Sequence, residues 1–208
     1  MTTPPDPRED SLRHRVKAEL RKRMRGLRQA MPATSCAERS SRIVMALEAM
    51  PEIATAEAVA LFWPIVDRHE VDVRTLDASL RARKVRVAYP SIDPETREMT
   101  FRWAEASHLD ERGLGFREPP PDATEVAARE LSAIIVPALA LDPNGHRIGY
   151  GAGYYDRALV RFSPPAVKVG VAFDFQLVSE VAITDGDVAL DWIITDARTM
   201  RAEPLTPR

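Results

Sequence analysis

One glycine-punctuated segment, residues 141–157 (LDPNGHRIGYGAGYYDR), contains the residues of this chain most suited to chemistry. Glycine lets the backbone take positive φ and approach a ligand without a Cβ in the way, so such a loop can direct several amide N–H groups at one anion. The segment follows the most strand-like run, 133–140, and leads into 154–162, where apolar and aromatic residues recur at helical spacing. A helix that begins there adds its positive N-terminal end. The order of strand, loop and helix predicts a phosphate-binding loop built on Gly149, Gly151 and Gly153.

Three charged residues border this loop and indicate what the phosphate belongs to. Arg147 and Arg157 flank it, and the planar donor fork of a guanidinium suits phosphate oxygens. Asp156 places a carboxylate beside the expected anion, which is repulsive unless a divalent cation lies between them. The combination favours Mg²⁺ bound together with a nucleotide. A tight strand-to-helix turn with solvated arginines is the alternative, because short glycine patterns recur by chance.

The composition is that of one folded domain. The chain has 208 residues, 45% of them apolar and 29% charged, and its net charge of −2 argues against a surface that wraps nucleic acid. No run approaches the roughly 18 consecutive apolar residues of a membrane span, and residues 1–10 lack the apolar core of a secretion signal. The single cysteine, Cys36, permits no internal disulfide and fits a reducing cytoplasm. We expect a cytoplasmic protein with one domain over residues 11–200 and disordered tails at 1–10 and 201–208.

Helical and strand-like segments alternate along the chain. Helices are expected over 12–31, 37–50, 73–83 and 154–162, and strands over 59–63, 85–89, 99–103, 133–140, 167–173 and 192–195. This alternation predicts a three-layer α/β fold, with a mostly parallel sheet and helices on both faces. Ligands of such sheets bind beyond the carboxyl ends of the strands. The loops after residues 63, 89, 140 and 173 are therefore expected to face one crevice.

The first expected helix has an apolar stripe and a basic stripe side by side. The apolar stripe comprises Leu12, Val16, Leu20, Met24 and Leu27, and the basic stripe comprises Lys17, Arg21, Arg25 and Arg28. The apolar stripe is expected to face the core, since its members recur at steps of three or four. Most of the basic residues are expected to be solvated, because charge runs usually form soluble surfaces. An RNA-binding helix is disfavoured because no aromatic residues alternate with the cations.

The segment 136–157 (VPALALDPNGHRIGYGAGYYDR) resembles the signature of the 5-formyltetrahydrofolate cyclo-ligase family, also called methenyltetrahydrofolate synthetases. Other segments resemble the same family in the same order: 17–21 (KAELR), 70–72 (EVD), 113–119 (GLGFREP) and 187–196 (DVALDWIITD). The glycine-tyrosine run is highly specific, whereas the other segments would be weak signals alone. The resemblance implies a fold of the NagB/RpiA/CoA-transferase kind. It also implies an ATP- and Mg²⁺-dependent ligase that converts 5-formyltetrahydrofolate to 5,10-methenyltetrahydrofolate with release of ADP and phosphate.

The resemblance assigns roles to particular residues. ATP is expected to contact Lys17, Arg21, Arg147, Gly149, Gly151, Gly153, Tyr155 and Arg157. The reduced folate is expected to contact Ile65, Glu70, Tyr150, Ala152 and Tyr154. Asp156 and Asp187 are the implied Mg²⁺ ligands, and Arg147, Tyr154 and Arg157 the catalytic residues. A carboxylate such as Glu70 suits the N–H donors of a reduced pterin.

Two positions differ from the family pattern and keep other functions open. Ala152 stands where a third successive glycine is common, and Gly186 stands where histidine usually precedes Asp187. One alternative is a paralogue with a nucleotide-binding or thiamine-related role. Another is a sugar-phosphate enzyme of the same broad fold that uses no ATP. Glu70 favours the ligase over both. We expect ATP and reduced folate as the binding partners, no binding to nucleic acid or membrane, and a monomeric protein.

Overall fold

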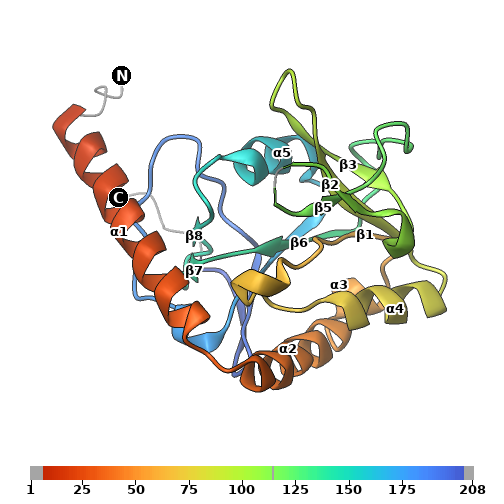
Figure 1. Cartoon of the computed structure of the whole chain (residues 1–208), viewed down its shortest axis with the longest axis horizontal. Coiled ribbons are helices and arrows are strands. Elements are labelled where there is room, and N and C mark those ends of the chain that lie inside the picture. The colour runs from red at the N-terminus through yellow and green to blue at the C-terminus, as the bar shows by residue number, and fades with distance from the viewer. Residues whose placement is uncertain (1–6, 114, 204–208) are drawn as a thin grey trace.

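A seven-stranded sheet forms the centre of the protein (Figure 1). The computed structural model describes residues 7–113 and 115–203. The strand order is β11-β10-β9-β6-β1-β2-β3. The strands are β1 (Ala58–Ala60), β2 (Arg86–Ile92), β3 (Met99–Trp103), β6 (Ala133–Pro137), β9 (Val167–Val171), β10 (Trp192–Ile194) and β11 (Thr199–Arg201). The five inner strands are parallel, and β3 and β11 pair antiparallel at the two edges.

Helices cover both faces of this sheet, as predicted. In Figure 1, α2 (Ala33–Glu48), α3 (Pro51–Ala54) and α4 (Arg74–Ala82) lie on one side and α5 (Tyr154–Phe162) lies on the other. Ile135 of β6 belongs to the core cluster under α2 and α4, whereas its neighbours Ile134 and Val136 belong to the cluster under α5. Successive strand residues point to opposite faces. Both faces of β6 are therefore buried, and the three-layer prediction is confirmed.

Short elements complete the chain. Two small antiparallel pairs join β4 (Asp110–Glu111) to β5 (Arg117–Glu118) and β7 (Ala140–Leu141) to β8 (Arg147–Ile148). The 3₁₀ turns are η1 (Val66–Arg68), η2 (Ala106–His108) and η3 (Asp174–Gln176). Within residues 7–113 and 115–203, each helix falls short of the length and apolar content that crossing a bilayer requires.

Several expected boundaries were wrong. The run 133–140 is not one strand, because the chain leaves β9 after Ala138 and Leu139 N donates to Ile148 O, which starts the β7–β8 pair. The first helix, α1 (Pro7–Gln29), includes residues 7–10 of the expected N-terminal tail. Proline at the first helical position and acids in the first turn favour this start. At the other end, Arg201 is in β11, and residues 1–6 and 204–208 of the expected tails lie outside the described residues.

Only part of the apolar stripe of α1 is buried, because Met24 and Leu20 pack against the body of the protein and the other members do not. Leu12, Val16 and Leu27 are 58%, 47% and 45% exposed, whereas Lys17 and Arg28 are buried together with Met24. Met24 packs with Leu139, Ala140, Ile148 and Val181, so α1 lies against the β7–β8 pair. The helix is rotated from the predicted orientation because its cations find carboxylates and a tyrosine on the body of the protein.

Candidate active site

A cavity of about 620 Å³ opens beyond the carboxyl ends of β1, β2 and β6. Every residue predicted for ATP, folate or Mg²⁺ lines it, so the structure brings the whole predicted set together. Its walls come from α1, the segment after β1, the β2–β3 hairpin, residues 147–157 and residues 184–187. The loop after residue 173 contributes as expected, because residues 184–187 of the long connection from β9 to β10 line the cavity, although residues 174–183 do not.

The glycine loop, residues 149–153, turns from β8 into α5. Gly151 and Gly153 have φ of 104° and 66°, which an L-residue rarely adopts, whereas Gly149 does not require a positive φ. A Cβ on Gly151 would lie 3.4 Å from the Arg21 guanidinium carbon. Arg21 Nε also donates to Gly149 O at 3.0 Å. Two of the three glycines are thus needed for the turn itself, and α1 packs directly on it.

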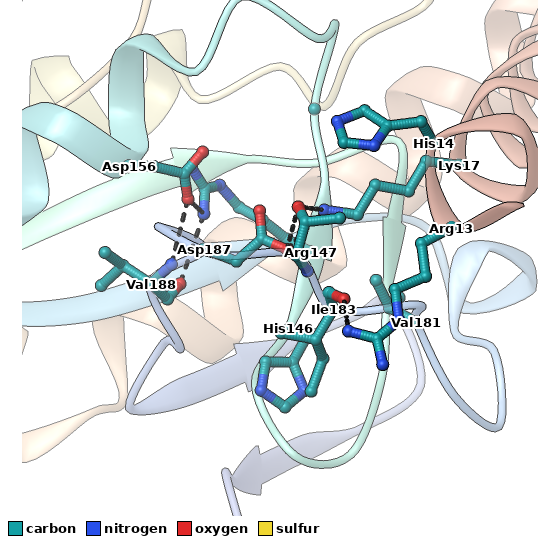
Figure 2. A network of polar contacts seen from close by, with 12 residues as sticks. Arg13, His14, Lys17, His146, Arg147, Asp156, Val181, Ile183, Asp187 and Val188 are labelled. Atoms are coloured by element: carbon teal, nitrogen blue, oxygen red, sulfur yellow. Dashed lines mark hydrogen bonds and ion pairs between the residues drawn. The ribbon is translucent and has the colours of Figure 1, made fainter. Parts of the chain in front are cut away.

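Each predicted metal ligand already binds a cation of the cavity (Figure 2). Arg147 Nη1 and Val188 N donate to Asp156 Oδ1 at 2.8 and 3.1 Å. The Lys17 ammonium donates to Asp187 Oδ2, and Thr184 N donates to the same oxygen at 2.8 Å. Burial alone would raise the pKa of the Asp187 carboxyl, but the Lys17 and Thr184 donors outweigh it and lower the pKa below its ordinary value.

The two aspartates fit a Mg²⁺ site that a phosphate completes. Among the described residues, Asp156 Oδ2 and Asp187 Oδ1 accept no hydrogen bond, and both residues line the cavity. No group of three or more acidic, histidine or cysteine side chains in that part of the chain could hold a metal alone. Protein-bound Mg²⁺ usually takes one or two carboxylates and completes its octahedron with phosphate and water. The donor set therefore suits a metal that arrives with a nucleotide.

Glu70 lines the same cavity and has a separate set of protein contacts. Its Oε2 accepts from Ile65 N at 2.8 Å, and its Oε1 accepts from the Tyr150 hydroxyl at 2.6 Å. Arg28 Nη2 donates to the same hydroxyl at 2.6 Å. The carboxylate is buried yet lines the cavity, so it can receive donors from a ligand.

Two tyrosines at the start of α5 carry unused hydroxyls. The hydroxyls of Tyr154 and Tyr155 are buried and have no hydrogen-bond partner among the described residues. Burial, with the nearby Glu70 charge, raises the pKa of Tyr155, so this phenol stays protonated. Buried polar groups normally find partners, and an unpartnered one in a cavity wall points to a ligand.

The sequence profile of the 5-formyltetrahydrofolate cyclo-ligase family matches residues 13–196. The chain belongs to this family. It is 27% identical over 179 residues to the 5-formyltetrahydrofolate cyclo-ligase of Escherichia coli strain K12, which covers 84% of this chain and 97% of the relative. It is 40% identical over 86 residues to that of Mycolicibacterium smegmatis, which covers only 41% of this chain and 44% of the relative.

The NMR structure of Aquifex aeolicus 5,10-methenyltetrahydrofolate synthetase has the same fold. Its TM-score to this chain is 0.79 at 27% identity, and the alignment covers 93% of this chain and 96% of that one. The predicted family and fold are confirmed, and the relatives identify this cyclo-ligase family member as a ligase. The roles of individual residues stay predictions.

Sequence reasoning missed three arginines at this cyclo-ligase site. Arg28 was expected to be solvated but is 3% exposed and reaches Tyr150. Arg68 and Arg97 line the cavity, and Arg97 adopts a left-handed φ of 60° at the tip of the β2–β3 hairpin. Arg157 Nη2 donates to Arg97 O at 3.3 Å and so ties this hairpin to the start of α5. The basic stripe contained Arg28 without distinguishing it from its neighbours, and nothing in the sequence marked Arg68 or Arg97.

Proposed function

We propose that this protein is an ATP- and Mg²⁺-dependent ligase that cyclises 5-formyltetrahydrofolate to 5,10-methenyltetrahydrofolate. The observation that carries the proposal is the gathering of both predicted ligand sets around one cavity, which Lys17, Arg21, Arg147 and Glu70 all line. Family membership and the names of the relatives support the same substrate. Cationic side chains that bind phosphate and a carboxylate that accepts from the pterin, placed around one cavity, would bring the formyl group to the γ-phosphate.

The chemistry requires activation of a poor leaving group. The formyl oxygen attacks the γ-phosphorus of ATP, the bond from that phosphorus to the bridging oxygen breaks, and ADP leaves. N10 of the folate then attacks the formyl carbon and loses its proton. Phosphate departs with the former formyl oxygen as the ring closes. No nucleophilic side chain is needed, because phosphoryl transfer depends mainly on positioning and on neutralising charge.

The residues of the nucleotide side can supply both requirements. Lys17 and Arg147 are buried cations that now bind Asp187 and Asp156, and phosphate oxygens would replace these carboxylates as their partners. Arg21 and the N–H groups of the glycine loop would add further donors. The two aspartates would then hold Mg²⁺, which when bound neutralises phosphate charge and orients the γ-phosphate.

The folate side would recognise an N–H-rich ring. Glu70 would accept from the pterin, Ile65 would pack against it, and the unpartnered Tyr154 hydroxyl would bond near the reacting group. Tyr150 and Ala152 would contact the substrate from the glycine loop. All of these residues come from one chain, so we expect the monomer to be active, which sedimentation at assay concentration would test.

The decisive experiment mixes purified protein, MgATP and 5-formyltetrahydrofolate and follows the absorbance of the methenyl product. We expect product to form and ATP to be hydrolysed only when the folate is present. ATP binding without any methenyl product, in protein shown to be folded, would favour a paralogue with another role. Binding of sugar phosphates but not of ATP would favour a non-ATP enzyme.

A further inference from the structure

Arg28 is a buried cation at the edge of the site, and the proposed reaction gives it no role. Its side chain is 4% exposed, its Nη2 donates to the Tyr150 hydroxyl at 2.6 Å, and the same nitrogen lies 3.9 Å from Glu70 Oε1. Its Nε has no hydrogen-bond partner within the described residues. A buried guanidinium that is incompletely paired is costly for folding alone. The position therefore suggests a functional reason for the charge.

The Tyr150 hydroxyl stands between this cation and the Glu70 carboxylate. It accepts from Arg28 and donates to Glu70 Oε1, both at 2.6 Å. One hydroxyl thereby joins α1, the segment after β1 and the glycine loop. The Arg68 guanidinium carbon, 5.1 Å from the centroid of the Tyr150 ring, adds a cation–π contact. Charge-assisted hydrogen bonds away from water are strong and directional, so this chain of contacts fixes the positions of both side chains.

Both partners of Arg28 line the cavity, but Arg28 itself does not. Glu70 is 5% exposed, and a buried carboxylate needs donors or a nearby positive charge to replace its lost hydration and to hold its orientation. Tyr150 lies between Gly149 and Gly151, where the backbone has no Cβ to restrict it, so its side-chain contacts hold this part of the loop. Removing the Arg28 charge would loosen the two residues together.

We propose that Arg28 is a positioning residue of the folate subsite, which holds Glu70 and Tyr150 in the arrangement that receives the pterin. This inference rests on the proposed function. Arg28 acts through its two partners and does not touch the substrate. Loss of the Arg28 side chain affects folate recognition. It leaves Lys17, Arg21 and Arg147, the cations proposed to bind phosphate, in place because their contacts are with other residues.

The test measures steady-state kinetics and thermal stability for Arg28→Gln, Arg28→Lys and a matched control, Arg23→Gln. Arg23 is an exposed arginine of the same helix, so its substitution makes the same change in charge away from the cavity. We expect Arg28→Gln to raise the KM for 5-formyltetrahydrofolate about tenfold or more, the effect of leaving a buried charged acceptor short of its partner. The KM for ATP stays unchanged, Arg28→Lys restores most of the loss, and Arg23→Gln behaves as wild type.

Other outcomes separate this inference from the proposed function. If the wild type forms no methenyl product, the proposed function fails first. If the wild type is active and folded Arg28→Gln keeps its KM for folate, or if both KM values rise together, Arg28 is not a positioning residue of the folate subsite. Should Arg28→Gln not fold, Tyr150→Phe removes only the bridging hydroxyl, and an unchanged KM for folate in that variant overturns the inference. The double variant, Arg28→Gln with Tyr150→Phe, is expected to have the same KM for folate as Arg28→Gln alone, because both changes break one chain of contacts.

Discussion

Asp156 and Asp187 illustrate how individual residues of this site serve the free and the loaded protein. In the free protein each carboxylate compensates a buried cation, Arg147 or Lys17. In the proposed function, a nucleotide phosphate with its metal would offer both members of each pair a better-matched partner: the cations would bind phosphate oxygens and the carboxylates would bind the metal. The ion pairs would therefore keep these buried charges satisfied until the proposed substrate binds.

This exchange predicts that Asp156→Asn separates activity from stability. The amide oxygen of asparagine can still accept from Arg147 and Val188 N, but the charge that compensates Arg147 is lost, so the free energy of unfolding is expected to fall by about 1–3 kcal/mol while the protein stays folded. Turnover is expected to fall about 100-fold or more, because charge stabilisation of several kcal/mol depends on the anionic ligand. Asp122→Asn, at an exposed turn, is the control for both measurements. Wild-type turnover in Asp156→Asn would remove this carboxylate from the mechanism.

The ion pair between Lys17 and Asp187 predicts a pH-dependent contribution to stability. The pKa of Asp187 is lowered in the folded protein, so its contribution is complete above the unfolded pKa of about 3.9 and is lost as pH falls through the folded pKa. Urea unfolding of Lys17→Met is expected to show a loss of about 1–3 kcal/mol at pH 7 that shrinks below about pH 4. Lys22→Met, exposed on the same helix, should lose little at either pH. A Lys17→Met deficit that is independent of pH would contradict this account.

The site residues differ in how far sequence could identify them. The glycine loop was predictable because its glycines and the adjacent arginines and aspartate lie within a few residues of one another and are all suited to binding phosphate and its metal. Arg28 was not, because Tyr150 and Glu70 are its partners only after folding brings residues 122 and 42 positions away beside it. An isolated arginine in a basic stripe carries no information about such partners.

At the scale of elements, α1 is the helix whose buried face departs most from the expected apolar pattern. It contributes Lys17, Arg21 and Arg28 to the site or its support, so its buried face is set by charge pairing as much as by apolar area. A pattern of apolar residues could not predict this orientation, because the helix has competing stripes and only the folded body decides between them. The strands were easier to predict, since β-branched runs in a doubly covered sheet have no alternative face.

The orientation of α1 predicts unequal effects for two neighbouring apolar residues. Met24→Ala is expected to destabilise the protein by about 2–5 kcal/mol, because Met24 is buried against the β7–β8 pair. Leu27→Ala, at a residue 45% exposed, is expected to stay within about 0.5 kcal/mol of wild type. Denaturant unfolding of the two variants provides the comparison. Equal losses would mean that the apolar stripe is the packed face after all.

At the scale of the whole molecule, the cavity joins segments from almost the full length of the chain. Its lining residues run from His14 in α1 to Asp187 before β10, and some lie at the carboxyl ends of strands of the sheet. Helix α1 meets the rest mainly through the small cluster at Met24 and through side chains at the cavity. A ligand that bridges α1 and the glycine loop would therefore add contacts where the molecule has few.

This arrangement predicts that nucleotide protects α1 selectively from amide hydrogen exchange. With MgADP at about 100 times its Kd, any opening that releases the ligand costs about 2.7 kcal/mol more, so the amides of α1 around Lys17 and Arg21 should exchange about 100-fold more slowly. The amides of α4, which packs on the sheet away from the cavity, should change only as far as they exchange through global unfolding. Equal protection of α1 and α4 would mean that α1 opens only when the whole protein unfolds. Protection of α4 alone would place the nucleotide outside this cavity and so contradict the proposed function.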